Sequence, residues 1–268
     1  MWLLKLILML TGLYSAVVGI AYLIQSWLIF PTGPTGSVSD LPPQSRYIEL
    51  ESEDGEHIVL VRIPPNQTSS EPRPLLLGFG GNAWNADAVA IMLHQIFPEY
   101  EVVAQHYRGY GPSSERPSAR ILFDDAQRSY DHLIKASTAG IVAIGFSLGA
   151  SVAVELAATR SLQGIVLVTP FDSLKELAAT HYPWLPVRLL LRHRMEAAAT
   201  LRGLDVPTAI ITAGNDVIVP KARSEAFRRV PTDLSADFTI DAVGHNDIYG
   251  SSKFKVALQN SVSAVARD

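Results

Sequence analysis

The stretch that decides the fold is "AIGFSLGASVAVELA", residues 143–157. It runs from an apolar segment through a Gly-Phe-Ser-Leu-Gly pentapeptide into small and apolar residues at helical spacing. A strand, a sharp turn and a helix in this order are typical of a motif that exposes a nucleophilic serine. Gly145 and Gly149 favour this interpretation, because side chains there would collide with the neighbouring strand and helix. We predict Ser147 as a nucleophile, and the simpler alternative is a serine that caps the helix.

Short apolar runs on both sides of this stretch alternate with longer segments of helical periodicity. Runs that are apolar on both faces and alternate with helices predict a mostly parallel sheet between helical layers. The segments 46–52 and 57–63 flank the turn "EDGE" and predict an antiparallel hairpin. With the hairpin, eight strands are expected. The other six runs are "PLLLGF", "EVVAQHY", "GIVAIGF", "GIVLVTP", "PTAIITAG" and "ADFTIDAV", and helices are expected at 119–137, 148–159, 220–229 and 251–266.

A nucleophilic serine needs a base and an acid that orients the base, and candidates for both follow predicted strands. Asp216 stands just past "PTAIITAG", and His245 follows "ADFTIDAV". Active groups of parallel sheets gather where loops leave the carboxyl ends of the strands, and serine, acid, histidine is the expected chain order. We predict Ser147, His245 and Asp216 as a catalytic triad. Asp172 in "TPFDSL" is the alternative acid.

A tetrahedral intermediate needs backbone donors aimed at its oxyanion. The amide of Leu148 directly follows the serine, and the glycines of "LLLGFGGNAWNAD" let a second loop approach the substrate closely. We predict the amides of Leu148 and Asn82 as the two donors, with Gly81 as the alternative to Asn82. A phosphate-binding loop is excluded, because no Gly-Lys-Ser/Thr follows and the dinucleotide spacing is absent. Neither a cofactor nor a metal is expected.

The first thirty residues are apolar and carry a single charge, Lys5. Residues 6–24 are uncharged, and at about 1.5 Å each they suffice to cross a hydrocarbon core about 30 Å thick. Trp2 and Tyr22 fall near the ends, where aromatic rings favour the membrane interface. We predict a transmembrane anchor over residues 1–30. Because Lys5 precedes the span, the positive-inside rule places the folded domain on the periplasmic or extracellular side.

Two alternatives stay open for this segment. Lys5 with the small residues Gly19 and Ala21 also fits a cleaved signal peptide, although the apolar span is longer than such peptides usually are. A buried core helix is the other alternative. Residues 31–45 are rich in Pro, Gly and Ser and predict a tether, so the globular domain is expected over residues 46–268.

The composition narrows the class of protein. A chain of 268 residues with 48% hydrophobic residues can bury a full core. Its net charge of −4 and the absence of a long Lys/Arg run argue against nucleic acid as a partner. The absence of cysteine excludes disulfides, thiolate metal sites and a cysteine nucleophile. The oligomeric state stays open.

Six short motifs extend from the third predicted strand to near the end of the domain: "FGGNA" (79–83), "YRGYGPSSERPS" (107–118), "GFSLGAS" (145–151), "TPFDSL" (169–174), "GNDVIVP" (214–220) and "GHND" (244–247). Together they resemble the α/β-hydrolase fold serine hydrolases. More narrowly, the chain resembles the membrane-anchored branch with bud-emergence-type hydrolases and protein depalmitoylases. The resemblance implies an α/β-hydrolase fold, with Ser147 as nucleophile, Asp216 as acid, His245 as base, and Asn82 and Leu148 as oxyanion donors.

The sequence departs from this family at two places. Gly80 stands where many relatives carry a histidine, which leaves the backbone donors intact but removes a side chain. The amino terminus lacks the cysteines of the depalmitoylases, so their acylated anchoring and palmitoyl-protein substrate are not implied. We interpret the motif at 107–118 as a structural loop that Tyr107 and Arg108 anchor.

Residues 173–202 stand where this fold inserts a small cap, and they mix aromatic and aliphatic residues with arginines. Such a segment can line an acyl-chain pocket, contact anionic headgroups or form ordinary core. His181 and His193 within it are expected to be cap or surface histidines. We expect a membrane-tethered serine hydrolase of carboxylic esters or thioesters, with small or lipid-derived substrates. An amidase, a peptidase, a cofactor-free haloperoxidase or a non-catalytic scaffold on the same fold is the alternative.

Overall fold

The computed structural model describes residues 1–33, 40–52, 54–66, 72–113, 116–137 and 139–266. A central sheet of eight strands has the order β1-β2-β4-β3-β5-β6-β7-β8. Strand β2 runs antiparallel to both of its neighbours, and the other neighbouring pairs are parallel. The strands are β1 (Arg46–Glu51), β2 (His57–Ile63), β3 (Leu75–Phe79), β4 (Val102–His106), β5 (Ile141–Phe146), β6 (Gly164–Val168), β7 (Thr208–Ala213) and β8 (Leu234–Ile240).

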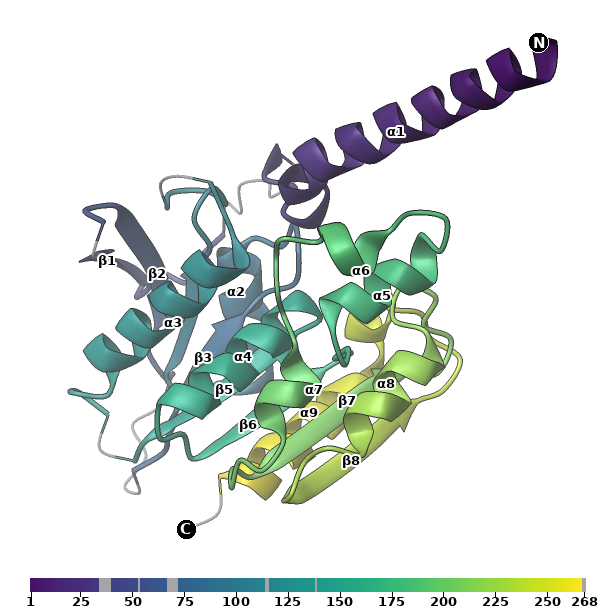
Figure 1. Cartoon of the computed structure of the whole chain (residues 1–268). Coiled ribbons are helices and arrows are strands. Elements are labelled where there is room, and N and C mark those ends of the chain that lie inside the picture. The colour runs from purple at the N-terminus through teal and green to yellow at the C-terminus, as the bar shows by residue number, and fades with distance from the viewer. Residues whose placement is uncertain (34–39, 53, 67–71, 114–115, 138, 267–268) are drawn as a thin grey trace.

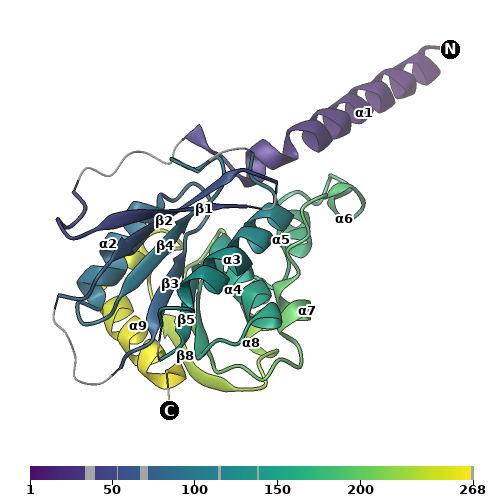
Figure 2. The same ribbon diagram turned by 90° about the vertical axis from the view of Figure 1, so that its left-hand side faces the viewer.

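Helices cover both faces of the sheet (Figures 1 and 2). One apolar core lies between the sheet and α3, α4, α7 and α8, and a second lies under α2 and α9. All residues of β3, β5 and β6 are buried, which explains their uninterrupted apolar sequences. The helices of the domain are α2 (Ala86–Ile96), α3 (Ala119–Leu133), α4 (Leu148–Thr159), α5 (Leu174–His181), α6 (Val187–Leu190), α7 (Ala197–Leu201), α8 (Lys221–Arg228) and α9 (Ser252–Val265), with a short 3-10 turn η2 (Ile248–Gly250) before α9.

Helix α1 (Trp2–Ile29) extends away from the domain along most of its length (Figure 1). Within the described part of the chain it is the one helix that is long and apolar enough to cross a membrane. It is therefore a candidate membrane span. The alternative of a buried core helix is wrong, because no residue of its most apolar window is buried.

The structure confirms the predicted fold class, with the hairpin at the edge of a mostly parallel sheet and helices on both faces. The four predicted helices correspond to α3, α4, α8 and α9, each ending within a few residues of its expected bounds. Helix α2 and the short helices α5, α6 and α7 were not predicted from the sequence. The division into anchor, tether and domain stays a prediction, and residues 34–39 of the tether lie outside the described residues.

Contact between α1 and the domain begins before the predicted domain boundary at Arg46. Gln25 is the one buried residue of α1. Phe30, the first residue after the helix, is 1% exposed and belongs to the main apolar core. The ring of Phe30 also meets the ring of His193 edge to face at 5.0 Å. The end of the apolar segment is therefore part of the folded domain.

Candidate active site

Ser147 occupies the turn between β5 and α4 in a backbone conformation that non-glycine residues rarely adopt. Its φ is 51° and its ψ is −110°. Its amide donates a hydrogen bond to the carbonyl oxygen of Val168 on β6, 2.8 Å away. Such strain persists only where the surrounding structure holds the residue in place. Here the neighbouring strand fixes the turn that presents the hydroxyl.

Two glycines make the turn possible because backbone lies where their side chains would be. A Cβ added at Gly145 would meet the carbonyl oxygen of Gly149 and lie 2.6 Å from the Cα of Ala150. At Gly149 it would meet the carbonyl oxygen of Phe79 and lie 2.5 Å from that of Gly80. Helix α4 thus packs directly against the end of β3, which brings the loop after β3 close to the serine.

His245 and Asp216 lie in line with the serine hydroxyl. The Nε2 atom of His245 is 3.0 Å from the Ser147 Oγ, and its Nδ1 is 2.7 Å from Asp216 Oδ2. Asp216 lies in the loop after β7 and His245 in the loop after β8, both at the carboxyl end of the sheet. The two side chains are more than nine-tenths buried. The structure therefore brings together the three predicted residues, which lie far apart in sequence.

The carboxylate of Asp216 is itself held by backbone donors. Its Oδ1 accepts hydrogen bonds from the amides of Ile218 and Val219, at 2.9 and 2.7 Å. Its Oδ2 is left for His245. An acid held in this way can fix the orientation and the tautomer of the imidazole. Nearby, burial raises the pKa of Tyr249 to about 12, so its phenol adds no charge to the site at neutral pH.

The alternative acid and the other two histidines have different partners. Asp172 forms an ion pair with Arg223 at 3.0 Å and accepts a hydrogen bond from the amide of Ser173. His181 on α5 bonds through Nε2 to the carbonyl oxygen of Ile218. His193 contacts α1, as described above. These three residues therefore bond to other partners and not to Ser147, His245 or Asp216.

The loop after β3 lies beside the serine. A Cβ added at Gly81 would be 3.6 Å from the Cβ of Ser147, and Asn82 lines the same pocket as Ser147 and Leu148. The next residue, Ala83, has a left-handed backbone with φ 57°. The predicted donor residues therefore flank the space in front of the hydroxyl, and their role as oxyanion donors stays a prediction.

Tyr107, the first residue of the motif at 107–118, contacts that loop. The buried phenol of Tyr107 donates a hydrogen bond to the carbonyl oxygen of Gly80 at 2.9 Å. Arg108 forms a bidentate ion pair with the buried Asp125 and a further pair with Asp54. These charge-assisted bonds raise the pKa of Arg108 further above its already high value. The bond from Tyr107 to the predicted oxyanion loop is a contact that the sequence did not reveal.

Comparison with known proteins decides the family. The profile of the alpha/beta hydrolase family matches residues 75–245, well over half of the chain. The chain belongs to this family.

The hydrolase has similar proteins in bacteria and fungi. An uncharacterised protein of Mycobacterium tuberculosis is 35% identical over 227 residues, covering 82% of this chain and 79% of that protein. Protein bem46 of Schizosaccharomyces pombe is 29% identical over 181 residues, covering 62% and 60%. An uncharacterised membrane protein of Saccharomyces cerevisiae is 26% identical over 253 residues, covering 89% and 88%. The match to bem46 confirms the resemblance to the bud-emergence-type hydrolases.

Solved structures show the same fold at low identity. A membrane phospholipase A described as a bacterial virulence factor has a TM-score of 0.65 at 14% identity, covering 100% of the hydrolase and 99% of that chain. The esterase Pf2001 of Pyrococcus furiosus has a TM-score of 0.65 at 16% identity, covering 85% and 94%. An alpha-beta serine hydrolase homologue from Coxiella burnetii has a TM-score of 0.62 at 15% identity, covering 83% and 99%.

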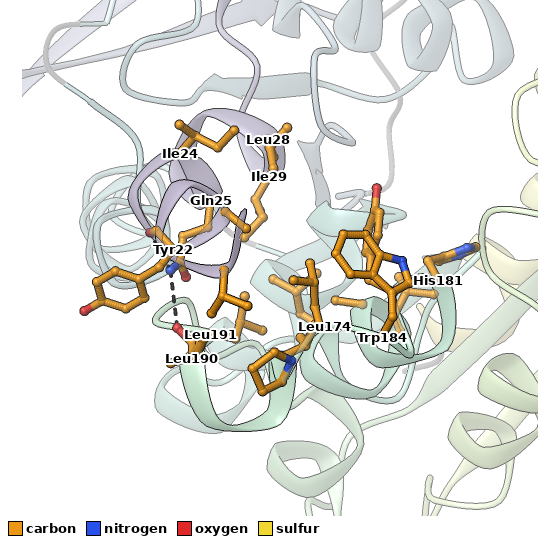
Figure 3. Close-up of a pocket in the computed structure, with 18 of the residues that line it drawn as sticks. Tyr22, Ile24, Gln25, Leu28, Ile29, Leu174, His181, Trp184, Leu190 and Leu191 are labelled. Carbon is orange, nitrogen blue, oxygen red and sulfur yellow. Dashed lines mark hydrogen bonds between the residues drawn. The ribbon is translucent and has the colours of Figure 1, made fainter. Parts of the chain in front are cut away.

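Ser147 of the hydrolase is part of the lining of a pocket of about 580 Å³. Figure 3 shows the side chains that line this pocket from α1 and from the predicted cap. One wall consists of α5, α6 and the loop between them, where the sequence predicts a cap. The facing wall is the carboxyl-terminal half of α1. The lining is mostly aliphatic and aromatic, and Ser147 and Asn82 are among its few polar residues. Its volume is within the range of small-molecule sites, and no signal in the sequence assigned α1 to its wall.

Proposed function

We propose that this hydrolase is a serine esterase or thioesterase that acts through an acyl-enzyme on Ser147. The observation that carries the proposal is the continuous hydrogen-bonded line from Ser147 through His245 to Asp216 at 3.0 and 2.7 Å. A hydroxyl, an imidazole and a carboxylate in this order are the groups that acyl transfer requires. The mostly apolar pocket beside the serine favours substrates with a hydrophobic acyl group.

In the proposed reaction the Ser147 Oγ attacks the acyl carbonyl while His245 Nε2 accepts its proton. Asp216 stabilises the resulting imidazolium and keeps Nδ1 protonated. The amides of Leu148 and Asn82 donate to the oxyanion. His245 then gives its proton to the leaving alcohol or thiol, and a water molecule releases the acid by the same route and regenerates the serine.

We further propose that α1 anchors the hydrolase in a membrane with the catalytic domain on the periplasmic or extracellular side. Its length and apolar surface support the anchor, and Lys5 at its amino-terminal end supports this orientation. Protease added to intact cells that carry a cytoplasmic marker tests the orientation. We expect the protease to digest the domain while the cytoplasmic marker stays intact. Digestion only after lysis would show that the domain lies on the cytoplasmic side and that the proposed orientation is wrong.

Labelling with a fluorophosphonate probe tests the catalytic proposal, because such probes react with activated serines. The wild-type chain is expected to be labelled and Ser147→Ala to lose the label, while the control Ser251→Ala is labelled as the wild type. A folded wild-type chain without label, or an equal label on Ser147→Ala, would leave the non-catalytic scaffold as the better hypothesis. Rates on matched p-nitrophenyl esters, thioesters and anilides then separate esterase, thioesterase and amidase activity.

A further inference from the structure

The apolar helix that would anchor the protein is also a wall of its pocket. The pocket on Ser147 is lined by α1 over the last three turns, from Val17 to Ile29. These residues cover about 18 Å along the helix axis. Among residues 1–24, Val18 and Ala21 are the two least exposed, and both line the pocket.

Polar contacts hold α1 in this place. The side-chain amide of Gln25 accepts a hydrogen bond from the amide of Arg192 at 2.7 Å and donates one to the carbonyl oxygen of Leu190 at 3.3 Å (Figure 3). The hydroxyl of Ser26 bonds to Nε2 of His193 at 2.7 Å. Burial, aided by the charge of Arg192, lowers the pKa of His193, which keeps this bond neutral. The wall is therefore fixed to the cap by side chains on one turn of the helix.

The cap tip, residues 182–190, lies beside a part of α1 that a bilayer would contain. The phenol of Tyr14 donates a hydrogen bond to the carbonyl oxygen of Trp184 at 2.8 Å. A span of about twenty residues that starts at Trp2 ends near Ala21, so Tyr14 would lie about 10 Å inside the apolar layer. The side chains of Trp184 and Leu189 are exposed on this tip.

A second observation, independent of the length of α1, indicates where the membrane surface lies along this helix. The guanidinium of Arg192 stacks over the ring of Tyr22 at 4.9 Å from its centroid. An aromatic ring with an arginine is typical of the membrane–water boundary. Tyr22 is the residue next to the end of the span that the length of α1 predicts. Both observations place the outer part of the pocket at the depth of the lipid acyl chains.

We propose that the pocket between α1 and the cap takes one acyl chain of an ester lipid directly from the bilayer, and that α1 sets which chain lengths fit. The proposal rests on the proposed function, because it names the substrate class of the same serine. The carbonyl is positioned at Ser147, and the tail lies along α1 toward Val17. Ala21, Val18 and Gln25 are then specificity-determining residues on the anchor itself.

Substitution of Ala21 in the full chain tests the role of α1. In detergent micelles, Ala21→Trp should lower the ratio of kcat/KM for p-nitrophenyl palmitate over butyrate by at least about tenfold, because the indole fills the path of a long tail. The matched control is Leu23→Trp, which adds the same group on the opposite, 74% exposed side of the helix. It should keep the wild-type ratio, and equal ratios in both variants would overturn the proposal.

Fluorophosphonate labelling of each variant separates this result from the proposed function. A wild-type chain that is neither labelled nor active on butyrate overturns the proposed function itself. Labelled variants with unchanged chain-length preference overturn only the role of α1. If Ala21→Trp does not fold, Val18→Phe, one turn away, takes its place with the same expected shift toward short chains.

A vesicle experiment tests whether the acyl chain comes from the bilayer. The full chain is reconstituted in phosphatidylcholine vesicles, and p-nitrophenyl palmitate is dissolved either in the same vesicles or in a separate population. Hydrolysis should be at least about tenfold faster when the enzyme and the ester share a bilayer. Equal rates in the two arrangements would show access from water and overturn uptake from the membrane.

Discussion

Ser147 has a strained backbone, and three neighbouring elements, two strands and a helix, hold it in that conformation. Its amide bonds to β6, Gly145 lies against α4, and Gly149 lies against the end of β3. Positive φ at a serine costs on the order of 1–3 kcal/mol. The surrounding contacts offset that cost and keep the hydroxyl 3.0 Å from the imidazole of His245.

Asp216→Asn tests whether the carboxylate orients His245. We expect kcat on p-nitrophenyl butyrate to fall about ten-thousandfold, because an amide at this position stabilises the wrong tautomer and cannot offset the imidazolium charge. The control is Asp172→Asn, at the alternative acid that pairs with Arg223. The assignment is wrong if Asp172→Asn abolishes turnover and Asp216→Asn leaves it within tenfold of the wild type.

Gly149→Ala tests the close approach of α4 to β3. The added methyl group meets two carbonyl oxygens that belong to backbone and cannot rotate away. We expect a loss of about 1–3 kcal/mol in the free energy of unfolding, together with reduced activity as the loop after β3 is displaced. Urea unfolding measures the loss. Gly250→Ala, where a Cβ meets nothing within 4 Å, should change the midpoint little.

At the scale of elements, the loop after β4 connects α3 to the loop after β3. Tyr107 holds the carbonyl oxygen of Gly80, while Arg108 ties the same loop to Asp125 on α3. Two adjacent residues thereby link the predicted oxyanion loop to a helix on the sheet face. The motif is expected to act by positioning, since neither side chain lines the pocket.

Arg108→Met tests this link and has a defined pH dependence. Burial raises the pKa of Asp125, and removal of the guanidinium raises it further. The variant is expected to lose about 3–5 kcal/mol of stability at pH 7, because a buried carboxylate lacks its partner. The deficit is present above the folded-state pKa and shrinks as pH falls toward the unfolded value near about 4.

Urea midpoints between pH 7 and 4.5 measure this dependence. The matched control is Arg120→Met, whose pair with Asp124 is exposed on the same helix. It should change stability by less than about 0.5 kcal/mol at every pH. A constant deficit of Arg108→Met across the pH range would contradict the account.

The elements and the candidate site were predictable to different degrees. The sheet and the residues Ser147, Asp216 and His245 follow from local patterns, since apolar runs mark strands and the candidate residues stand at their ends. Helix α2 was not predicted, although the sequence carries signals for it: Asn85 caps it, and its buried apolar residues, Ala86, Val89, Ala90 and Leu93, recur at helical spacing. The contacts of Gln25 and Tyr14 with the cap join residues more than 160 positions apart, which no local pattern encodes.

At the scale of the whole molecule, the carboxyl-terminal end of α1 packs together with the folded domain. Phe30 fills the main core, Gln25 and Ser26 bond to the cap, and α1 lines the pocket on Ser147. The candidate membrane span therefore ends inside the folded domain. Its orientation relative to the sheet follows from these contacts.

Phe30→Ala in the full chain tests whether the end of α1 is packed into the core of the domain. A fully buried phenylalanine exchanged for alanine costs about 3–5 kcal/mol, so the urea midpoint in detergent should fall clearly. The control is Trp27→Ala, whose ring is 66% exposed and lies one turn earlier. If both variants unfold at the wild-type midpoint, α1 is joined to the domain by its covalent connection alone, and the prediction that Phe30 stabilises the core of the domain is wrong.

The pair Gln25 and Ser26 has a consequence for protein engineering. An apolar helix borrowed from another protein would still insert into lipid, but it would bring no amide for Leu190 and Arg192 and no hydroxyl for His193. A chimera of this kind would be tethered with an open flank beside its serine. If α1 sets the chain-length preference as we propose, replacing this helix would change the selectivity of the hydrolase as well as its attachment to the membrane.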